Sequence, residues 1–531
     1  MASQQVEVEK KYDVGADAEV PDLRLVPGVA RVGEPRVDRL EAVYFDTEGS
    51  ALAARGITLR RRVGGHDAGW HAKLPPEASQ QDADSASGPR RRRELHAPLG
   101  QPGVVPDSLL AHLLVYLRGD DPLPVVRLET QRTTYPLYGE DGVHLADLAD
   151  DQVTAQILKS SAAQDDDSDT RQWREWELEL VHGSPELFPA ADDVLTAAGA
   201  SPAGHGSKLA KALQGTEAKV PADDVTGAVP PNNAGPRKKG PASELLAAYL
   251  AAQIREILAH DPEVRLEQPE AVHQLRSATR RARSALAAYR RLYSAGAVRR
   301  LRDELKWLGG VLGAPRDADV MLDRLRGHAA ELPEGEAAAA VAARLEEELG
   351  NRLDTSYRKL QKALLSERYF RLLDDLDAFS SRPPVRPQAA GPARKTAGKV
   401  VAKAATRLRR TAKAVKRSRR GAQHETALHD VRKDAKRLRH VAESVVPVHG
   451  KRASKIVKAA HRQQSILGDF HDSVVARDLL ATLAAGPDLP EAEASAFVTL
   501  HTRQVQLAAE AEAKYWKARR KSRRLLKRGV G

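Results

Sequence analysis

Two short segments carry acidic side chains at every second position. One spans residues 6–12 and contains Glu7, Glu9 and Lys11, and the other spans residues 173–180. Because side chains of a β-strand alternate between its two faces, the acids of each segment would share one face. Carboxylates this close repel one another unless a cation lies between them. A solvated strand face also tolerates such charges, so the pattern indicates a metal site only in combination with other features.

The strands expected between these two acidic segments carry cations instead. Arg60 and Arg62 lie two positions apart, and so do His71 and Lys73, so the two side chains of each pair would share a face. A closed antiparallel sheet with these charges inside could grip a triphosphate with its cations while its acids hold a metal ion. We expect strands at 42–46, 57–63, 69–74, 91–95, 125–137, 142–148, 152–158 and 172–181, and helices at 106–117, 185–198 and 206–213.

Length and composition limit the class of protein. A chain of 531 residues predicts two or three domains. A mean hydropathy of −0.48, without a long apolar run or a signal-type N-terminus, predicts a soluble intracellular protein. The absence of cysteine excludes disulfides, thiolate chemistry and cysteine-ligated zinc, and it leaves oxygen ligands for Mg²⁺ or Mn²⁺.

Charge divides the chain into two parts. Residues 1–241 carry 27 Lys and Arg against 38 Asp and Glu, whereas residues 242–531 carry 57 against 34. The change coincides with a Pro- and Gly-rich segment, so we predict a domain at 1–216, a linker at 217–241 and a helical domain at 242–531. Residues 80–88 and 160–170 read as disordered loops.

The basic part contains two similar patterns of cations, which predict two internal copies at about 242–380 and 398–525. In each copy the offsets are i, i+3, i+7 and i+10, which place the side chains along one helix face. Like charges at this spacing cost stability unless an anion binds them. A solvated helix face is the alternative. The two sets are His273, Arg276, Arg280 and Arg283, and His429, Arg432, Lys436 and Arg439.

The ordered motifs of the first part resemble a CYTH domain of the triphosphate tunnel metalloenzymes, over about residues 4–214. They are Glu7-x-Glu9-x-Lys11, Tyr44-Phe45-Asp46-Thr47, Leu59-Arg60-Arg61-Arg62, Trp70-His71-Ala72-Lys73-Leu74-Pro75, Arg92-Arg93-Glu94 and Glu177-x-Glu179. The resemblance implies an eight-stranded antiparallel tunnel that cleaves triphosphate with a divalent metal, Mg²⁺ or Mn²⁺.

The same resemblance implies roles for individual residues. Lys11 and Lys73 fall at catalytic cationic positions. An aspartate of the pair Asp150 and Asp151 completes the metal-binding set, with Asp150 preferred, and Glu175 is a solvated neighbour or a spare ligand. The metal-binding acids are Glu7, Glu9, Asp150, Glu177 and Glu179, and the phosphate-binding cations are Arg60, Arg62, Arg92, Arg132 and Lys208. Arg61 should point outward by alternation.

The second part resembles a CHAD domain, a histidine-marked helical domain, over about residues 242–525. This resemblance implies a duplicated helical bundle that binds inorganic polyphosphate through the two cationic sets. The whole protein is then a multidomain α+β protein with a cytoplasmic location, and it could associate with polyphosphate granules.

Three functions remain open from the sequence. The first is metal-dependent hydrolysis of inorganic triphosphate or short polyphosphate, with the helical domain holding the chain. The second is a non-catalytic protein that tethers polyphosphate. The third is nucleic-acid binding, of which we expect only sequence-tolerant electrostatic contact, because aromatic residues make up 4% of the chain. Hydrolysis or nucleotidyl transfer, the metal and the oligomeric state also stay open.

Overall fold

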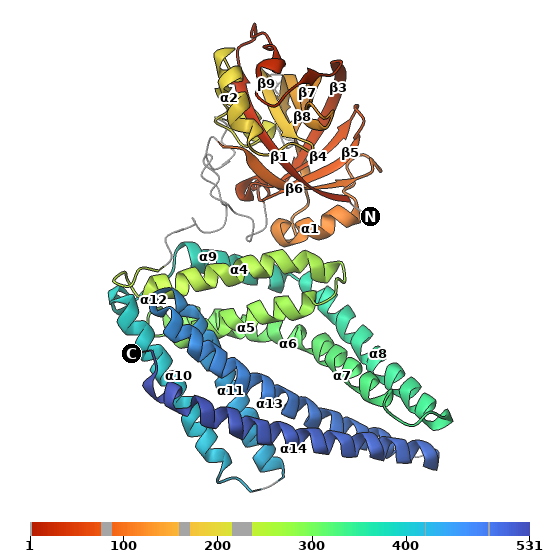
Figure 1. Ribbon diagram of the computed structural model, residues 1–531, viewed down its shortest axis with the longest axis vertical. Coiled ribbons are helices and arrows are strands. Elements are labelled where there is room, and N and C mark those ends of the chain that lie inside the picture. The colour runs from red at the N-terminus through yellow and green to blue at the C-terminus, as the bar shows by residue number, and fades with distance from the viewer. Residues whose placement is uncertain are drawn as a thin grey trace. The chain divides into compact units, whose positions relative to one another are not determined.

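The computed structural model describes residues 3–75, 88–158, 170–214, 236–419, 421–486 and 489–530. The chain divides into two compact units, Met1–Pro230 and Pro231–Gly531. The first unit is built on β-strands and the second is built from helices (Figure 1). Most of the predicted linker at 217–241 and of the predicted loops at 80–88 and 160–170 lies outside the described residues.

The first unit is a closed antiparallel barrel, which confirms the predicted fold class. Its strands are β1 Ser3–Val14, β3 Arg36–Asp46, β4 Thr58–Val63, β5 Gly69–Leu74, β6 Arg90–Ala97, β7 Leu123–Tyr138, β8 His144–Ile157 and β9 Thr170–Leu180. They pair in the order β1-β6-β5-β4-β3-β7-β8-β9, and β9 pairs with β1 to close the sheet. Two short strands, β2 Arg31–Val32 and β10 Ser201–Pro202, pair with β7 and β1. The separate strands predicted at 142–148 and 152–158 were wrong, because β8 runs through both.

Two helices cover the outer surface of the barrel. Helix α1, Asp107–Leu117, packs Leu113 into an apolar cluster with Trp70 of β5. Helix α2, Leu187–Ala197, packs Phe188 into another cluster with Trp176 of β9. The apolar residues that pack under α1 and α2 therefore face outward, which leaves the alternate residues of β5 and β9 facing the interior.

A third helix, α3 Lys208–Ala212, fills part of the interior. Its Leu209 packs with Leu128 and Val153, which face inward from β7 and β8. The hydroxyl of Ser207 accepts a hydrogen bond from the amide of Ala210 and begins the helix. The interior is therefore divided into an apolar part against α3 and a charged part, a division that the sequence did not reveal.

The second unit consists of helices, as predicted. They are α4 Ser243–Arg265, α5 Ala271–Tyr289, α6 Ala295–Val311, α7 Gly313–Ala329, α8 Glu336–Leu364, α9 Glu367–Ser381, α10 Ala393–Val415, α11 Ala422–Ser444, α12 Val446–His449, α13 Lys451–Ala484 and α14 Glu491–Arg528. Helix α4 packs on α5 as α10 packs on α11. Leu325 of α7, Leu345 of α8, Leu480 of α13 and Phe497 of α14 belong to one apolar cluster that joins the two halves of the unit. Among the described helices, none combines the length and apolarity that a membrane span requires.

Candidate functional site

Strand pairing places the two acidic segments next to each other inside the barrel. In the β1–β9 pair, Glu9 lies opposite Glu179 and Lys11 lies opposite Glu177. In the β8–β9 pair, Asp151 lies opposite Glu175. Glu7 and Glu9 are buried, so the face that they share with Lys11 is the inner face. One local rule, alternation along a strand, thus brings acids from three strands to one surface.

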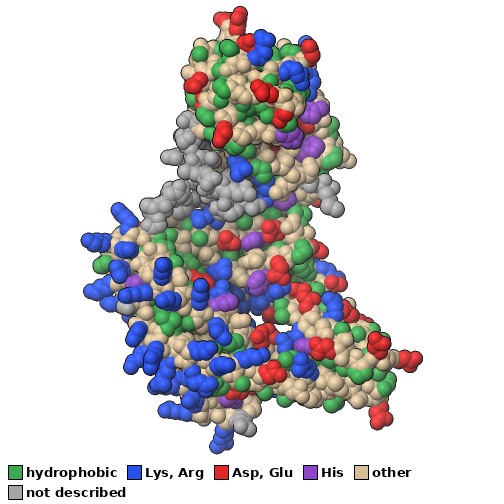
Figure 2. All heavy atoms as spheres, in the orientation of Figure 1, with side chains coloured by type: hydrophobic (Ala, Val, Ile, Leu, Met, Phe, Trp, Pro, Cys, Tyr) green, Lys and Arg blue, Asp and Glu red, His purple; other side chains and the backbone are tan. Residues whose placement is uncertain are grey.

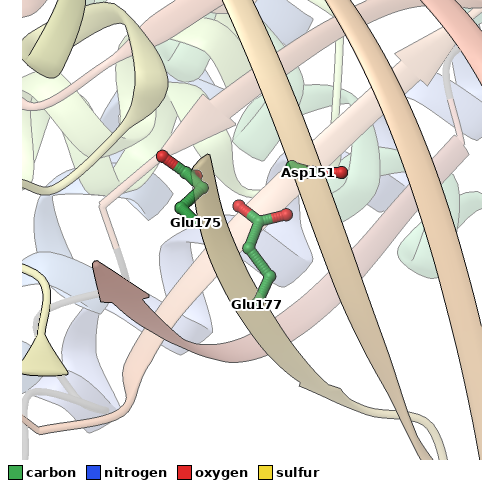
Figure 3. Close-up of side chains that lie close together, drawn as sticks. All are labelled: Asp151, Glu175 and Glu177. Carbon is green, nitrogen blue, oxygen red and sulfur yellow. The ribbon is translucent and has the colours of Figure 1, made fainter. Parts of the chain in front are cut away.

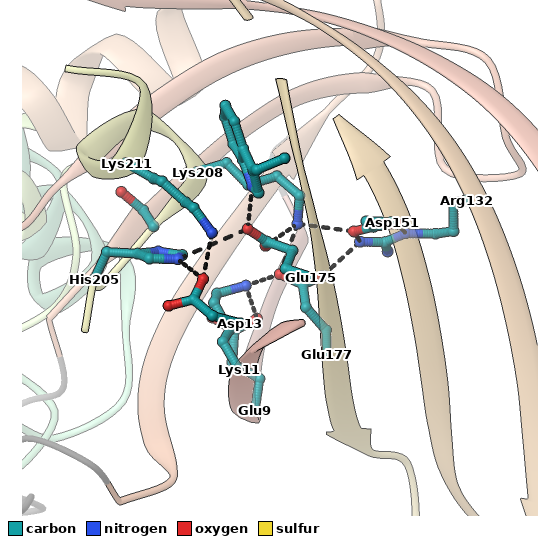
Figure 4. A network of polar contacts seen from close by, with 12 residues as sticks. Glu9, Lys11, Asp13, Arg132, Asp151, Glu175, Glu177, His205, Lys208 and Lys211 are labelled. Atoms are coloured by element: carbon teal, nitrogen blue, oxygen red, sulfur yellow. Dashed lines mark hydrogen bonds and ion pairs between the residues drawn. The ribbon is translucent and has the colours of Figure 1, made fainter. Parts of the chain in front are cut away.

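Asp151, Glu175 and Glu177 form the tightest acidic cluster among the described residues. Each offers an oxygen, and these three oxygens lie within 4.8 Å of one another (Figure 3). The ammonium of Lys208 at the start of α3 lies 2.8 Å from an oxygen of each acid. The guanidinium of Arg132 donates to Asp151 and Glu177, and Lys11 pairs with Glu177 (Figure 4). Three buried carboxylates and three cations therefore interleave within a single network.

This network fixes the charge states of its members. Burial by itself raises the pKa of Asp151, but Arg132 and Lys208 outweigh burial and hold that pKa well below its usual range. Burial lowers the pKa of Lys11 to about 8, although Glu9 opposes the shift. Asp151 is therefore ionised at neutral pH, and Lys11 titrates close to it.

A second acidic group, Glu7, Glu9 and Glu179, lies beside Lys73 and Arg92. The ammonium of Lys73 is 2.6 Å from an oxygen of Glu7, and the guanidinium of Arg92 is 3.6 Å from Glu9. Burial and the neighbouring Glu7 raise the pKa of Glu179 to about 7. The remaining oxygen of Glu7, Oε2, and Oε1 of Glu9 are buried and accept no hydrogen bond from any described residue. Buried carboxylate oxygens without a hydrogen-bond donor are suitable ligands for a hard divalent cation, so these acids could hold a metal ion.

Strands β4 and β6 add further cations to the interior. The guanidinium of Arg60 donates to the hydroxyl of Tyr44 at 3.3 Å, and Arg92 donates to the backbone carbonyl of Gly206. Burial, together with the charges of Arg60 and Arg132, lowers the pKa of Arg62 to about 9. A buried cation such as Arg62, whose pKa is lowered by neighbouring cations, favours a polyanionic ligand, because the negative charge would relieve the repulsion.

The structure corrects the choice between the two neighbouring aspartates. The carboxylate of Asp150 accepts two hydrogen bonds from Arg174, at 2.8 and 2.7 Å, and it lies opposite Trp176 on the outward side of the sheet. Asp151 faces the interior. The aspartate that offers its carboxylate to the interior is therefore Asp151 and not the preferred Asp150, because the continuous strand β8 fixes which residues point inward. Glu175 is fully buried in the cluster, so it is not a solvated neighbour.

The alternation predicted for β4 agrees with the structure. Arg61 points outward, where its Nε donates to the carbonyl of Leu99 at 3.2 Å. His71, between the cationic strands, lies 3.0 Å from Glu94 through its Nδ1, and burial lowers its pKa to about 4. His71 is therefore neutral at pH 7 and does not add to the positive charge of the interior.

The sequence did not single out the residues at one mouth of the barrel. The Nε2 atom of His205 lies 3.2 Å from Asp13, and the indole of Trp173 donates to Glu175 at 2.6 Å. Lys211 of α3 also pairs with Asp13 (Figure 4). An open cavity of about 1160 Å³ is lined in part by Asp13, Trp173, His205 and Lys211. The feature that connects these residues with the acidic cluster is the pairing register of β1 with β9, which places Asp13 opposite Glu175.

In the helical unit, four of the eight predicted cations lie together where α5 and α11 meet. Burial, followed by the charges of Arg276 and Arg432, lowers the pKa of Arg280 to about 10. Burial, followed by the charges of Arg280 and Arg432, lowers the pKa of Lys436 to about 6. The carboxylate of Asp317 accepts from Arg276 at 2.9 Å. We call Arg276, Arg280, Arg432 and Lys436 the α5–α11 cluster.

The other four predicted residues lie at its margins. The His429 ring centroid is 4.5 Å from that of His471 on α13, and burial lowers the pKa of His429 to about 4. His273 is exposed. Arg439 donates to Glu443 at 2.8 Å, so its charge is matched within its own helix. Burial and Arg302 lower the pKa of Arg283. His471 was not predicted, although its place in the repeated segment after each cationic helix was visible.

Comparisons with known proteins agree with this division. Residues 5–212 match the CYTH domain and residues 248–481 match the CHAD domain. A Mycobacterium tuberculosis H37Rv protein named "Uncharacterized protein Rv2226" is 36% identical over 514 residues, which cover 95% of this chain and 93% of that protein. Two solved structures resemble part of the chain. PptA from Streptomyces chartreusis is 23% identical, with a TM-score of 0.46, over 52% of this chain and 99% of its own. The CHAD domain from the plant Ricinus communis is 26% identical, with a TM-score of 0.42, over 53% of this chain and 92% of its own.

Proposed function

This chain belongs to the family of proteins that join a CYTH domain to a CHAD domain, and from that premise we propose that it hydrolyses inorganic triphosphate or short polyphosphate with a divalent metal. A CYTH domain indicates activity on phosphoanhydrides in general. The finer proposal rests mainly on one observation. Inside the barrel, the acids Asp151, Glu175 and Glu177 interleave with Lys208, Arg132 and Lys11, so carboxylates that could hold a metal and cations that could hold phosphate occupy the same small volume.

The acids of the interior would hold the metal. Asp151, Glu175 and Glu177 offer three oxygens close together, and Glu7 and Glu9 offer oxygens without a donor. A divalent cation supplies Lewis-acid polarisation of phosphoryl oxygens at such a site. The chain itself contributes fixed carboxylates, which need no rearrangement to face the interior because strand pairing already holds them there.

The cations of the interior would grip the phosphate chain. Arg60 and Arg62 lie on β4 and Arg92 lies on β6, and Lys73 of β5, the strand between them, contacts Glu7 at 2.6 Å. Guanidinium and ammonium groups stabilise the charge that develops on phosphate oxygens when the anhydride bond breaks. Lys11, with its pKa of about 8, can hold or release a proton next to Glu177 near neutral pH.

We propose that the helical unit binds inorganic polyphosphate through the α5–α11 cluster. Two observations support this proposal: four cations converge from two helices, and each of Arg280 and Lys436 has a depressed pKa. A protein retains such repulsion at a cost in stability, which a bound polyanion would offset. Binding of this kind would also allow association with polyphosphate granules.

Phosphate release tests the catalytic proposal. The full chain is incubated with inorganic triphosphate, long-chain polyphosphate, ATP or thiamine triphosphate, each with Mg²⁺, Mn²⁺ or a chelator. We expect release from triphosphate or short polyphosphate that requires metal and that is lost in Asp151→Asn with Glu177→Gln. Asp150→Asn is the matched control, because Asp150 faces Arg174 outside the barrel. An equal loss of phosphate release in Asp150→Asn would contradict the assignment of Asp150 to the outer face of the barrel.

A specific observation favours a second candidate, the non-catalytic tether. Lys11, Lys208 and Arg132 already neutralise the acids Asp151, Glu175 and Glu177, so this cluster has a balanced charge without metal. A tether would bind polyphosphate and release no phosphate from any of the four substrates with either metal. That pattern would replace the hydrolase proposal.

A further inference from the structure

A second basic surface lies on the other side of α11 from the α5–α11 cluster. Asp434 of α11 faces α10 and pairs with Arg407 at 2.8 Å, whereas Lys436 of α11 faces the cations of α5. The basic surface is formed by α10 and by the last part of α14. Figure 2 shows Lys and Arg side chains gathered at the lower left of the helical unit, where Figure 1 places these two helices. We call it the α10–α14 surface.

The charge of this surface is one-sided. Residues 393–419 contain eleven Lys and Arg and no acid, and residues 514–528 contain nine and no acid. Most of these side chains are exposed. Among the described residues, one cation of α10 forms an ion pair, Arg407 with Asp434. In the segment 514–528, Lys514 pairs with Glu510 at 3.6 Å. Within the part of the chain that the structure describes, nearly all of this charge therefore has no acidic partner.

The two helices run side by side in opposite directions. At one end the ammonium of Lys416 lies 5.8 Å from the ring centroid of Trp516. At the other end, a Cβ at Gly398 would lie 4.0 Å from Val530. The exposed cations of the two helices therefore form two neighbouring rows. With a rise of 1.5 Å per residue, the α10 row from Lys395 to Lys413 is about 27 Å long, and packed helices lie about 8–10 Å apart.

The fold does not require this charge. In the first half of the unit, α4 packs on α5 and α9 in the way that α10 packs on α11 and α14. Helices α4 and α9 each carry two Lys or Arg and four Asp or Glu. An equivalent pair of helices is thus stable with an acidic surface. Repelling cations at i, i+4 spacing cost stability, so the basic surface is better explained by a ligand than by folding.

We propose that the α10–α14 surface binds the phosphodiester backbone of double-stranded nucleic acid without reading its sequence. Duplexes present two lines of phosphates on either side of a groove about 6–12 Å wide, which matches two rows of cations on neighbouring helices. A single polyphosphate chain needs only one row. The surface has no exposed large apolar side chain among its described residues, and a membrane-binding surface would need one. This proposal does not rest on the proposed function, because it concerns different residues.

Binding of a fluorescent DNA duplex of about two helical turns to the full chain tests the proposal. Four exposed lysines are changed together in the test variant, Lys399→Gln, Lys403→Gln, Lys517→Gln and Lys521→Gln. Loss of four phosphate contacts should weaken binding roughly tenfold or more at about 100 mM salt. It should also reduce the slope of log affinity against log salt by about 3 to 4, because each contact contributes about 0.9.

The matched control removes four exposed cations elsewhere on the helical unit, Arg299→Gln, Lys306→Gln, Lys359→Gln and Lys362→Gln. It has the same net charge as the test variant and should bind DNA like the wild type. If the control weakened DNA binding equally, the effect would depend on net charge alone, and the proposal would be overturned. So would a wild type that fails to bind duplex DNA at about 50 mM salt.

Long-chain polyphosphate binding by the same variants separates this proposal from the proposed function. We expect the test variant to retain polyphosphate affinity, and Arg280→Gln with Lys436→Gln to lose it while retaining DNA binding. If the test variant instead lost polyphosphate binding and kept DNA binding, the surface would be an extension of the polyphosphate site, and the duplex proposal would be wrong.

Discussion

Binding of polyphosphate should take up a proton at Lys436. In the free protein, burial and then the charges of Arg280 and Arg432 lower the pKa of Lys436 to about 6. A phosphate chain next to the ammonium stabilises its charged form, so the pKa of Lys436 should rise toward the ordinary lysine value of about 10.4. A group whose pKa rises on binding contributes fully below its free pKa and loses its contribution as pH rises toward its bound pKa.

The size of the effect follows from these values. At pH 8, about 1% of the free protein carries the proton on Lys436, so binding should take up close to one proton. Affinity should fall about tenfold per pH unit between roughly pH 7 and 9. The histidines of this region do not interfere, because burial lowers the pKa of both His429 and His471. Arg280, with a pKa of about 10, stays charged across most of this range.

Isothermal titration calorimetry in buffers with different ionisation enthalpies measures this proton number directly. Long-chain polyphosphate is the ligand, since its internal phosphates do not titrate in this range. Lys436→Arg should bind with little pH dependence, because the guanidinium keeps its charge. Lys433→Arg is the matched control. Lys433 is exposed and paired with Asp430, so its replacement should leave the proton uptake unchanged.

Two results would refute this reasoning. One is a proton uptake near zero in the wild type at pH 8, which would mean that Lys436 is already charged before the ligand arrives. The other is an undiminished uptake in Lys436→Arg, which would place the titrating group elsewhere.

Three further predictions concern the barrel and the linker. Glu7→Gln with Glu9→Gln should reduce phosphate release at least about 100-fold, because two proposed metal ligands are lost. Polyphosphate affinity should change little. Loss of polyphosphate binding with the fold retained would contradict the separate roles of the two units. Mn²⁺ affinity, followed by the loss of free-ion paramagnetic signal, should fall up to about tenfold per pH unit below pH 7. Burial and the neighbouring Glu7 raise the pKa of Glu179 to about 7, so Glu179 is protonated below pH 7 and must lose that proton to bind metal. Metal affinity therefore falls as pH falls. Glu179→Gln should remove most of this dependence of Mn²⁺ affinity on pH. Proteolytic cleavage within residues 221–240 should yield a β-rich piece and a helical piece by circular dichroism, and a predominantly helical N-terminal piece would be incompatible with the barrel.

Much of the fold could be read from the sequence because its signals are local. Alternation along a strand is a property of a few neighbouring residues, so the shared face of Glu7, Glu9 and Lys11 was predictable, and so was the outward direction of Arg61. Helical spacing is equally local, and the rows of cations on α5 and α11 followed from it. The change from an acidic to a basic composition near the linker was by itself enough to indicate two units.

The tertiary structure decided the questions that depend on distant residues. Asp151 replaced Asp150 because pairing across β8 and β9 fixes which of two adjacent side chains points inward, and no local pattern contains that register. Glu175 became a member of the acidic cluster for the same reason. Four of the eight predicted cations of the helical unit converge because α5 and α11 cross there, and the depressed pKa of Lys436 arises from burial and from charges on both helices. Local periodicity tells which side chains share a face, but only packing determines what that face meets and how much water it retains.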